Sequence, residues 1–139
     1  MAQGPESRLW QSLKRSMPKT WTAHRIENRS GGGLPDVFVN ADGLPFWVEL
    51  KVINLTRVKI SPHQIAWHFS FFRNKGLSFF LVQDPRSRFI HALRGCESRN
   101  LASKPLLEND IFGSYKDRAE MWSDLGAAAR DHYISIFEN

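Results

Sequence analysis

The sequence has very little cysteine: Cys96 is the only one in 139 residues. A single thiol forms no intramolecular disulfide and no cysteine zinc cluster, which excludes a disulfide-stapled scaffold and the usual structural zinc sites. The five histidines also lack the spacing of zinc ligands. No apolar run is long enough to cross a bilayer, and the opening residues MAQGPESRLW lack the apolar stretch of a secretory signal. We therefore expect a cytoplasmic protein with no membrane partner.

Internal repeats and low-complexity tracts are likewise absent from the sequence, so its 139 residues are most simply one domain, 1–139. Hydrophobic residues make up 42% and charged residues 24%, as in ordinary soluble globular proteins. Acidic residues are the scarcer charge, 14 against 19 Lys and Arg, which gives a formal net charge of +5. Because clustered cations release condensed counterions from nucleic acid, this excess favours a polyanionic partner such as DNA.

Hydrophobic periodicity predicts an α/β chain. The expected elements, in order, are a helix at 5–17, a strand at 21–28, a hairpin with strands at 37–39 and 46–52, a helix that follows Ser61 and closes at Lys75-Gly76, and strands at 77–83 and 88–93. Aromatic residues at helical spacing, Phe69 and Phe72 among them, predict that the second helix faces the core. Beyond residue 93 the signals weaken, and we expect a short helix and loop at 101–109 and a helix at 117–130.

Charged side chains gather on the hairpin. Side chains alternate along a strand, so Glu49 and Lys51 share one face while Leu50 points the other way. Asp36 opens the neighbouring strand and can come close to both across the ladder. Two carboxylates and an ammonium on a sheet that is otherwise apolar indicate a chemical site. The alternative is a structural salt bridge between Lys51 and one of the two carboxylates.

Three short motifs give this region a family resemblance. G-x-P-D at 33–36, F-W-V-E-L-K at 46–51 and S-P-H-Q at 61–64 resemble the virus-type replication-repair nuclease (VRR-NUC) domain of the PD-(D/E)xK nuclease superfamily. The resemblance covers roughly residues 6–93 and leaves a C-terminal, helical part at 94–139 without a counterpart. It implies a restriction-endonuclease-like αβββαβ core with a mixed central sheet flanked by helices. Stand-alone domains of this family are commonly encoded by phages, which implies the host cytoplasm as the location.

The resemblance also implies an activity, that of a metal-dependent DNA endonuclease hydrolysing phosphodiester bonds. Mg²⁺ would be the cofactor, with Mn²⁺ as a substitute. Asp36 and Glu49 would hold the metal ion, together with the backbone carbonyl of Leu50. Lys51 would stand beside the attacking water or the scissile phosphate, where its charge offsets the charge that develops in the transition state.

Three further residues have two interpretations each. Gln64 follows Ser61 by three residues, which predicts a capping box, and the resemblance also turns this Gln toward the metal site. Glu6, in the first turn of the first helix, complements the helix dipole, whereas relatives carry a metal-site Glu on this helix. Glu27 precedes the three glycines at 31–33, which we call the glycine loop, and is either a third acidic ligand or the surface partner of a neighbouring arginine.

The expected partners are DNA and a second copy of the chain. Arg8, Arg29, Arg57 and Lys59 are the basic residues assigned to DNA contacts. Relatives act on branched DNA, including four-way junctions, and symmetric cutting of a junction requires two sites, so we predict a homodimer. Apolar residues within 122–137 either form the dimer contact or cap the sheet of a monomer. Two other functions stay open: a nuclease acting on flaps, ends or single strands, and a nucleic-acid-binding module that no longer cleaves.

Overall fold

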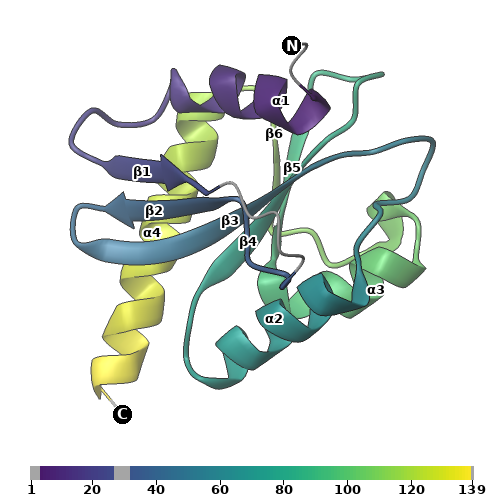
Figure 1. Cartoon of the computed structure of the whole chain (residues 1–139). Helices are drawn as coiled ribbons and strands as arrows, with labels where there is room; N and C mark the ends of the chain where they lie inside the picture. The colour runs from purple at the N-terminus through teal and green to yellow at the C-terminus, as the bar shows by residue number, and fades with distance from the viewer. Residues whose placement is uncertain (1–3, 27–31, 139) are drawn as a thin grey trace.

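The structure is a computed structural model that describes residues 4–26 and 32–138 (Figure 1). Two predicted site residues, Glu27 and Arg29, lie outside the described residues. The helices are α1 (Pro5–Lys14), α2 (Pro62–Arg73), α3 (Ser98–Ser103) and α4 (Arg118–Glu138), with short 3₁₀ helices η1 (Gly95–Glu97) and η2 (Leu106–Glu108). The strands are β1 (Thr22–Arg25), β2 (Val37–Ala41), β3 (Leu44–Val52), β4 (Ser78–Gln83), β5 (Ile90–Arg94) and β6 (Gly113–Tyr115).

These strands form one sheet in the order β1-β2-β3-β4-β5-β6. Neighbouring strands are antiparallel except for β3 and β4, which run parallel and are connected through α2. A parallel pair needs such a crossover, because the chain must return to the end of the sheet where the first strand began before the second strand can start. Up to β4 the order is helix, three strands, helix and strand. The predicted αβββαβ core, with a mixed sheet flanked by helices, is confirmed.

Helices cover both faces of the sheet (Figure 1). α1 and α4 pack on one face, in a core cluster that takes Phe79 and Leu81 from β4. On the opposite face, Phe80 and Val82 of the same strand join a second cluster with Leu101 of α3, and α2 lies on this side too. A strand buried on both faces is apolar throughout, because its side chains alternate between two cores. This confirms the prediction of a doubly buried strand at 77–83.

The hairpin between β2 and β3 turns at Asp42 and Gly43, whose φ angles are 54° and 94°. Two successive residues with positive φ match the right-handed twist of a two-residue hairpin. Asn40 Oδ1 accepts a hydrogen bond of 2.6 Å from the Gly43 N–H, which closes the turn. The predicted turn at 40–43 is therefore present, and the register it sets pairs Val37 with Val48.

The prediction for α2 is wrong in one respect. Phe69 and Phe72, expected in the core, are 45% and 50% exposed, whereas His68 is the residue of this helix that is fully buried. α2 lies over the part of β3 that carries polar side chains, so the face it turns to the sheet is the one with Gln64 and His68, four residues apart. The aromatic stripe is left on the outer side, where the guanidinium of Arg73 stands over the ring of Phe69.

The C-terminal part differs from the prediction in two places. β6 pairs with β5, and its three residues are too few to show an alternating pattern in the sequence. α4 runs on from the predicted end at residue 130 to Glu138. Gly126 lies within this helix, where Trp21 leaves no room for a side chain: a Cβ at this position would lie 2.8 Å from Cζ2 of Trp21. No helix within 4–26 and 32–138 has the length and apolar character needed to span a membrane.

Candidate active site

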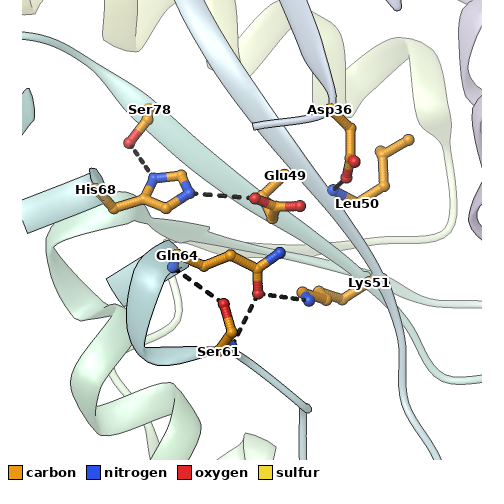
Figure 2. Close-up of polar contacts among 8 residues, drawn as sticks. All are labelled: Asp36, Glu49, Leu50, Lys51, Ser61, Gln64, His68 and Ser78. Atoms are coloured by element: carbon orange, nitrogen blue, oxygen red, sulfur yellow. Dashed lines mark hydrogen bonds and ion pairs between the residues drawn. The ribbon is translucent and has the colours of Figure 1, made fainter. Parts of the chain in front are cut away.

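Asp36 lies directly before β2 and interacts with Glu49 of the neighbouring strand β3. β2 begins at Val37, which pairs with Val48, and the same register carried one residue further places Asp36 beside Glu49. Asp36 Oδ2 accepts a hydrogen bond of 2.8 Å from the backbone N–H of Leu50, which holds this carboxylate against β3 (Figure 2). The structure thus brings together the two carboxylates that the sequence analysis placed across the hairpin.

Gly33, three residues before Asp36, packs on the first turn of α2. Gly33 is buried, has a φ of 80°, and would place a Cβ only 2.3 Å from the backbone oxygen of His63. Glycine alone allows two backbones to approach this closely in that conformation. The contact brings the loop that ends at Asp36 and the helix turn that carries Gln64 to one place on the sheet.

Lys51 and Gln64 connect β3 to α2. Lys51 Nζ donates a hydrogen bond of 3.0 Å to Gln64 Oε1, and the same amide oxygen accepts from the Ser61 N–H at 3.0 Å. Ser61 Oγ in turn accepts from the Gln64 N–H at 3.2 Å, so the predicted capping box is confirmed. Among the described residues, Lys51 forms no ion pair with Asp36 or Glu49. Its ammonium is therefore held by the helix cap rather than by either acid.

Glu49 faces a buried histidine that the sequence analysis does not place in the site. Glu49 is 2% exposed and His68 is 0% exposed. His68 Nε2 lies 3.5 Å from Glu49 Oε1, and Nδ1 of the same ring lies 2.8 Å from Oγ of Ser78 in β4 (Figure 2). The sequence does contain one signal for His68: it follows Gln64 by four residues, and that spacing puts both on one face of a helix. Nothing comparable marks Ser78.

Burial governs the electrostatics of the site. Burial, followed by hydrogen bonding with Glu49 and the charge of that neighbour, raises the pKa of Asp36 from 3.8 to about 7. The pKa of Glu49 is also raised, again chiefly by burial. Burial lowers the pKa of His68 to about 4, so its ring is neutral at neutral pH. Buried Glu49 therefore faces a neutral imidazole, with the half-buried Asp36 beside it, and the protein's own residues do not fully compensate the charge of the two carboxylates.

This donor set fits a hard divalent cation. Glu49 Oε1 is buried and has no hydrogen-bond partner among the described residues. A cation bound at this carboxylate would favour the charged form of Glu49 and of Asp36, which burial disfavours. In the described part of the chain, no group of three or more His, Cys, Asp or Glu side chains is placed to hold a metal. Two carboxylates, with backbone oxygen and water completing the shell, match the way proteins usually bind Mg²⁺.

Glu6 lies at the rim of this site. It is partly buried in the first turn of α1, and its charge contributes to the raised pKa of Glu49. The dipole interpretation of Glu6 fits this position, and so does a ligand role through an intervening water. The metal role of Glu6 stays a prediction.

Of the basic residues predicted to contact DNA, Arg8, Arg57 and Lys59 are described, and all three are exposed. Arg57 and Lys59 lie on the segment between β3 and α2, where Arg57 Nη1 donates to the carbonyl of Ser103 at 2.6 Å. Arg8 is exposed on α1. Their role in DNA binding stays a prediction.

A second basic surface was not predicted as a unit. A groove of about 750 Å³ lies where the C-terminal end of α1 meets β1. Within the described residues it has no acidic lining, and its charged or titratable side chains are Lys14, Arg15, Lys19, His24 and Arg25. Trp10 and Trp21 also line it. Basic side chains next to aromatic ones suit a nucleic acid, whose phosphates and bases need both kinds of contact.

Comparison with known proteins gives a likeness in structure and none in sequence. No protein-family model and no curated protein matches the sequence. Among solved structures, the chain is similar to Hjc of Archaeoglobus fulgidus, a Holliday junction resolvase from an archaeal hyperthermophile, with a TM-score of 0.48 and 16% sequence identity. The match covers 64% of this chain and 72% of that chain.

Proposed function

We propose that this protein is a metal-dependent nuclease that hydrolyses phosphodiester bonds in DNA. The observation that carries the proposal is Glu49, a buried carboxylate beside a second carboxylate, Asp36, with no Lys or Arg ion-paired to either among the described residues. Beside them, Lys51 is held by Gln64 and not by either acid. A structural ion cluster would pair these charges with one another. Here the two acids are left to bind a cation, and the ammonium is left to face an anion.

Each residue then has a distinct task. Asp36, Glu49 and the backbone carbonyl of Leu50 would hold Mg²⁺ or Mn²⁺, and the Asp36 carboxylate is already anchored by the Leu50 N–H. When bound, the ion would supply Lewis acidity for generating hydroxide and for stabilising charge on the phosphate. Lys51 would place its positive charge on the non-bridging phosphate oxygens or the attacking water. Gln64 keeps that ammonium in place, because its amide oxygen is fixed by the Ser61 cap.

DNA is the proposed substrate because the chain offers cations where a phosphate backbone could run. All the basic side chains that line the groove at the end of α1 come from two short segments, 14–19 and 24–25. Contacts to several phosphates release counterions and provide affinity that does not depend on base sequence. Branched DNA such as a four-way junction is the substrate that the motif resemblance favours. Flaps, ends and single strands are the alternatives.

The test is a cleavage assay with purified protein on labelled linear, flapped and four-way DNA, with Mg²⁺, Mn²⁺ or EDTA. We expect cutting with either metal, none with EDTA, and the fastest cutting on the junction. Glu49→Gln should not cut, whereas Glu108→Gln, which changes an exposed carboxylate on η2, should cut like the wild type. Binding of DNA without cutting under every condition would support the non-cleaving module instead.

The third acid can be assigned by ranking two variants. If Glu6 completes the metal site from α1, Glu6→Gln should reduce Mg²⁺-dependent cleavage by about tenfold or more, and Glu27→Gln should have little effect. The reverse ranking would place the ligand just before the glycine loop. Small and equal effects would leave Asp36 and Glu49 as the protein's carboxylate ligands.

We further propose that the active form is a homodimer, since a junction cut symmetrically needs two sites. Only exposed apolar residues are available for a contact between two copies of the chain. Within 122–137, Trp122 and Leu125 are fully buried in the chain's own core, whereas Ile134 and Phe137 are 51% and 85% exposed. Sedimentation at micromolar concentration should show a dimer that Phe137→Glu weakens. A wild-type monomer that still cuts both strands of a junction would contradict the dimer.

A further inference from the structure

A buried polar chain runs from β4 through α2 to the proposed metal site. Ser78 Oγ lies 2.8 Å from His68 Nδ1, and His68 Nε2 lies 3.5 Å from Glu49 Oε1 (Figure 2). All three residues are at most 5% exposed. Neither Nε2 nor Oε1 has a hydrogen-bond partner elsewhere in the described part of the chain. A shift of about half an ångström would turn their contact into a normal hydrogen bond.

Hydrogen-bond chemistry selects one tautomer of His68. A carboxylate oxygen only accepts, whereas a serine hydroxyl can donate or accept. If Nδ1 carried the proton, Nε2 would direct a lone pair at the Glu49 oxygen. If Ser78 donates its O–H to Nδ1, the proton sits on Nε2 and points at the carboxylate. The second arrangement satisfies every group, so Ser78 fixes which imidazole nitrogen faces Glu49.

The surroundings leave the ring little freedom. The rings of Phe80 and Trp67 lie against it, with centroids 4.5 and 5.2 Å away. On the side of the serine, a Cβ at Gly95 would lie 1.9 Å from Ser78 Oγ and 2.8 Å from His68 Nδ1. Glycine is therefore required where η1 passes this pair. Three separate elements hold the imidazole in a single orientation, with Nε2 toward Glu49.

We propose that His68 and Ser78 are positioning residues that orient the Glu49 carboxylate for metal binding, with Ser78 setting the tautomer and His68 Nε2–H donating to Oε1. This inference rests on the proposed function. Oε1 of Glu49 is then held by His68, and Oε2 of the same carboxylate is free to bind the cation. Hydrogen-bond partners of this kind, which orient a ligand without touching the metal, typically contribute a factor of about 10 to 100 in metal affinity. A merely structural histidine would contribute to folding and leave metal affinity unchanged.

The decisive comparison uses two amides at position 68. The side-chain nitrogen of Gln reaches the place of Nε2, and that of Asn reaches only the place of Nδ1. Both variants replace a buried ring by an amide, so a structural role predicts similar behaviour. We expect His68→Gln to bind Mn²⁺ within about threefold of the wild type and His68→Asn to bind about 10- to 100-fold more weakly. Free Mn²⁺ is measured by electron paramagnetic resonance in the absence of DNA.

Ser78→Ala provides a second variant that removes a single oxygen and is the least able to disturb folding. It should weaken Mn²⁺ binding by about threefold to tenfold, because the ring then has no tautomer preference. Thermal midpoints show that each variant is folded at the assay temperature. Equal Mn²⁺ affinity of wild type, Ser78→Ala and a folded His68→Asn would overturn the positioning role.

The two proposals fail in different ways. Wild-type protein that binds Mn²⁺ no better than Glu49→Gln would remove the metal site itself, and the positioning role with it. A wild type that binds Mn²⁺ through Glu49, with unchanged affinity in the His68 and Ser78 variants, would remove the positioning role alone. Greatly weakened His68→Asn beside near-normal His68→Gln supports both.

Discussion

The two faces of β3 can be compared residue by residue, because neighbouring side chains of one strand point to opposite sides of the sheet. Phe46, Val48 and Leu50 face α1 and α4, are at most 1% exposed, and belong to an apolar core. Glu49 and Lys51 point toward α2, where the same strand meets a helix cap and a buried histidine. Helices cover both faces, but the face toward α1 and α4 is apolar on both sides of the contact, whereas the face toward α2 buries charged and polar side chains.

Burial has opposite consequences on the two faces. On the α1 and α4 face it removes apolar surface from water, which stabilises the fold by about 25 cal/mol for each Å². On the α2 face it raises the pKa of Glu49 and of its neighbour Asp36, because an ionised carboxylate is worse solvated there. The apolar face therefore stabilises the fold. The polar face lowers the free energy of unfolding, because it keeps two carboxylates poorly solvated where they can bind a cation. Five predictions separate these roles.

The largest effect is expected for Glu49→Gln, which keeps the size of the side chain and removes its charge. Metal-dependent cleavage should fall by about 10³-fold or more, since a metal-binding oxygen anion becomes a neutral amide. The free energy of unfolding in the absence of metal should stay the same or rise, because a buried carboxylate is no longer desolvated. Initial rates and urea denaturation measure the two quantities. Wild-type-like cutting would remove Glu49 from the site.

Lys51→Ala sharpens the same comparison on the neighbouring residue of that face. Cleavage should again fall by about 10²- to 10³-fold, while affinity for DNA, measured in Ca²⁺, changes little. The reason is that Lys51 is one cation among many for binding but the cation held at the carboxylates by Gln64. A variant that loses DNA binding and cleavage in equal proportion would make Lys51 a binding residue.

On the opposite face, Phe46→Ala should destabilise the protein by about 3–5 kcal/mol, as removal of a buried aromatic ring usually does. The cleavage rate of the folded fraction should stay within about threefold of the wild type. Phe72→Ala is the matched control, because it deletes the same side chain at a site that is 50% exposed on the outer side of α2. That change should alter the free energy of unfolding by about 0.5 kcal/mol or less. If both variants lost cleavage like Glu49→Gln, the two faces would not be separable.

Titration of Asp36 should have an effect on stability that is smaller than that of Phe46→Ala. Burial and the neighbouring Glu49 raise the pKa of Asp36 from 3.8 to about 7, so in that range the folded protein binds more protons than the unfolded chain. The contribution of Asp36 to the free energy of unfolding therefore declines as pH rises through this range. We expect Asp36→Asn to flatten the decline measured in EDTA between about pH 4 and about pH 7. Mn²⁺ should restore wild-type stability above that range, and an unchanged slope in Asp36→Asn would refute the shift.

The smallest effect concerns the basic groove. Lys14→Ala and Lys19→Ala should each weaken DNA binding modestly and reduce the slope of log affinity against log salt by about 0.9 for each phosphate that the protein no longer neutralises. Arg130→Ala, an exposed cation on α4, is the control and should leave the slope unchanged. Binding is measured by fluorescence anisotropy in Ca²⁺. Equal slopes for the groove variants and the control would show that DNA does not occupy the groove.

The sequence by itself determined what depends on local pattern. Alternation along residues 46–52 placed Glu49 and Lys51 on one face, and Ser61 with Gln64 predicted a cap that the structure contains. The turn at 40–43 specified the hairpin, and with it the position of Asp36 opposite Glu49. These features follow from strand period, turn chemistry and capping, which act over a few residues.

Tertiary structure decided which side of each element faces its neighbours and which side chains from different elements meet. Helical spacing could not say which side of α2 faces the sheet, so Phe69 and Phe72 were expected inside and His68 was not placed in the site. The contact of His68 with Ser78 and Glu49 joins three consecutive elements, β3, α2 and β4, and no pattern within any one of them contains it. The basic groove likewise exists only because α1 ends beside β1. The raised carboxyl pKa values come from burial, which is a property of the packed molecule and not of the residues that carry the charge.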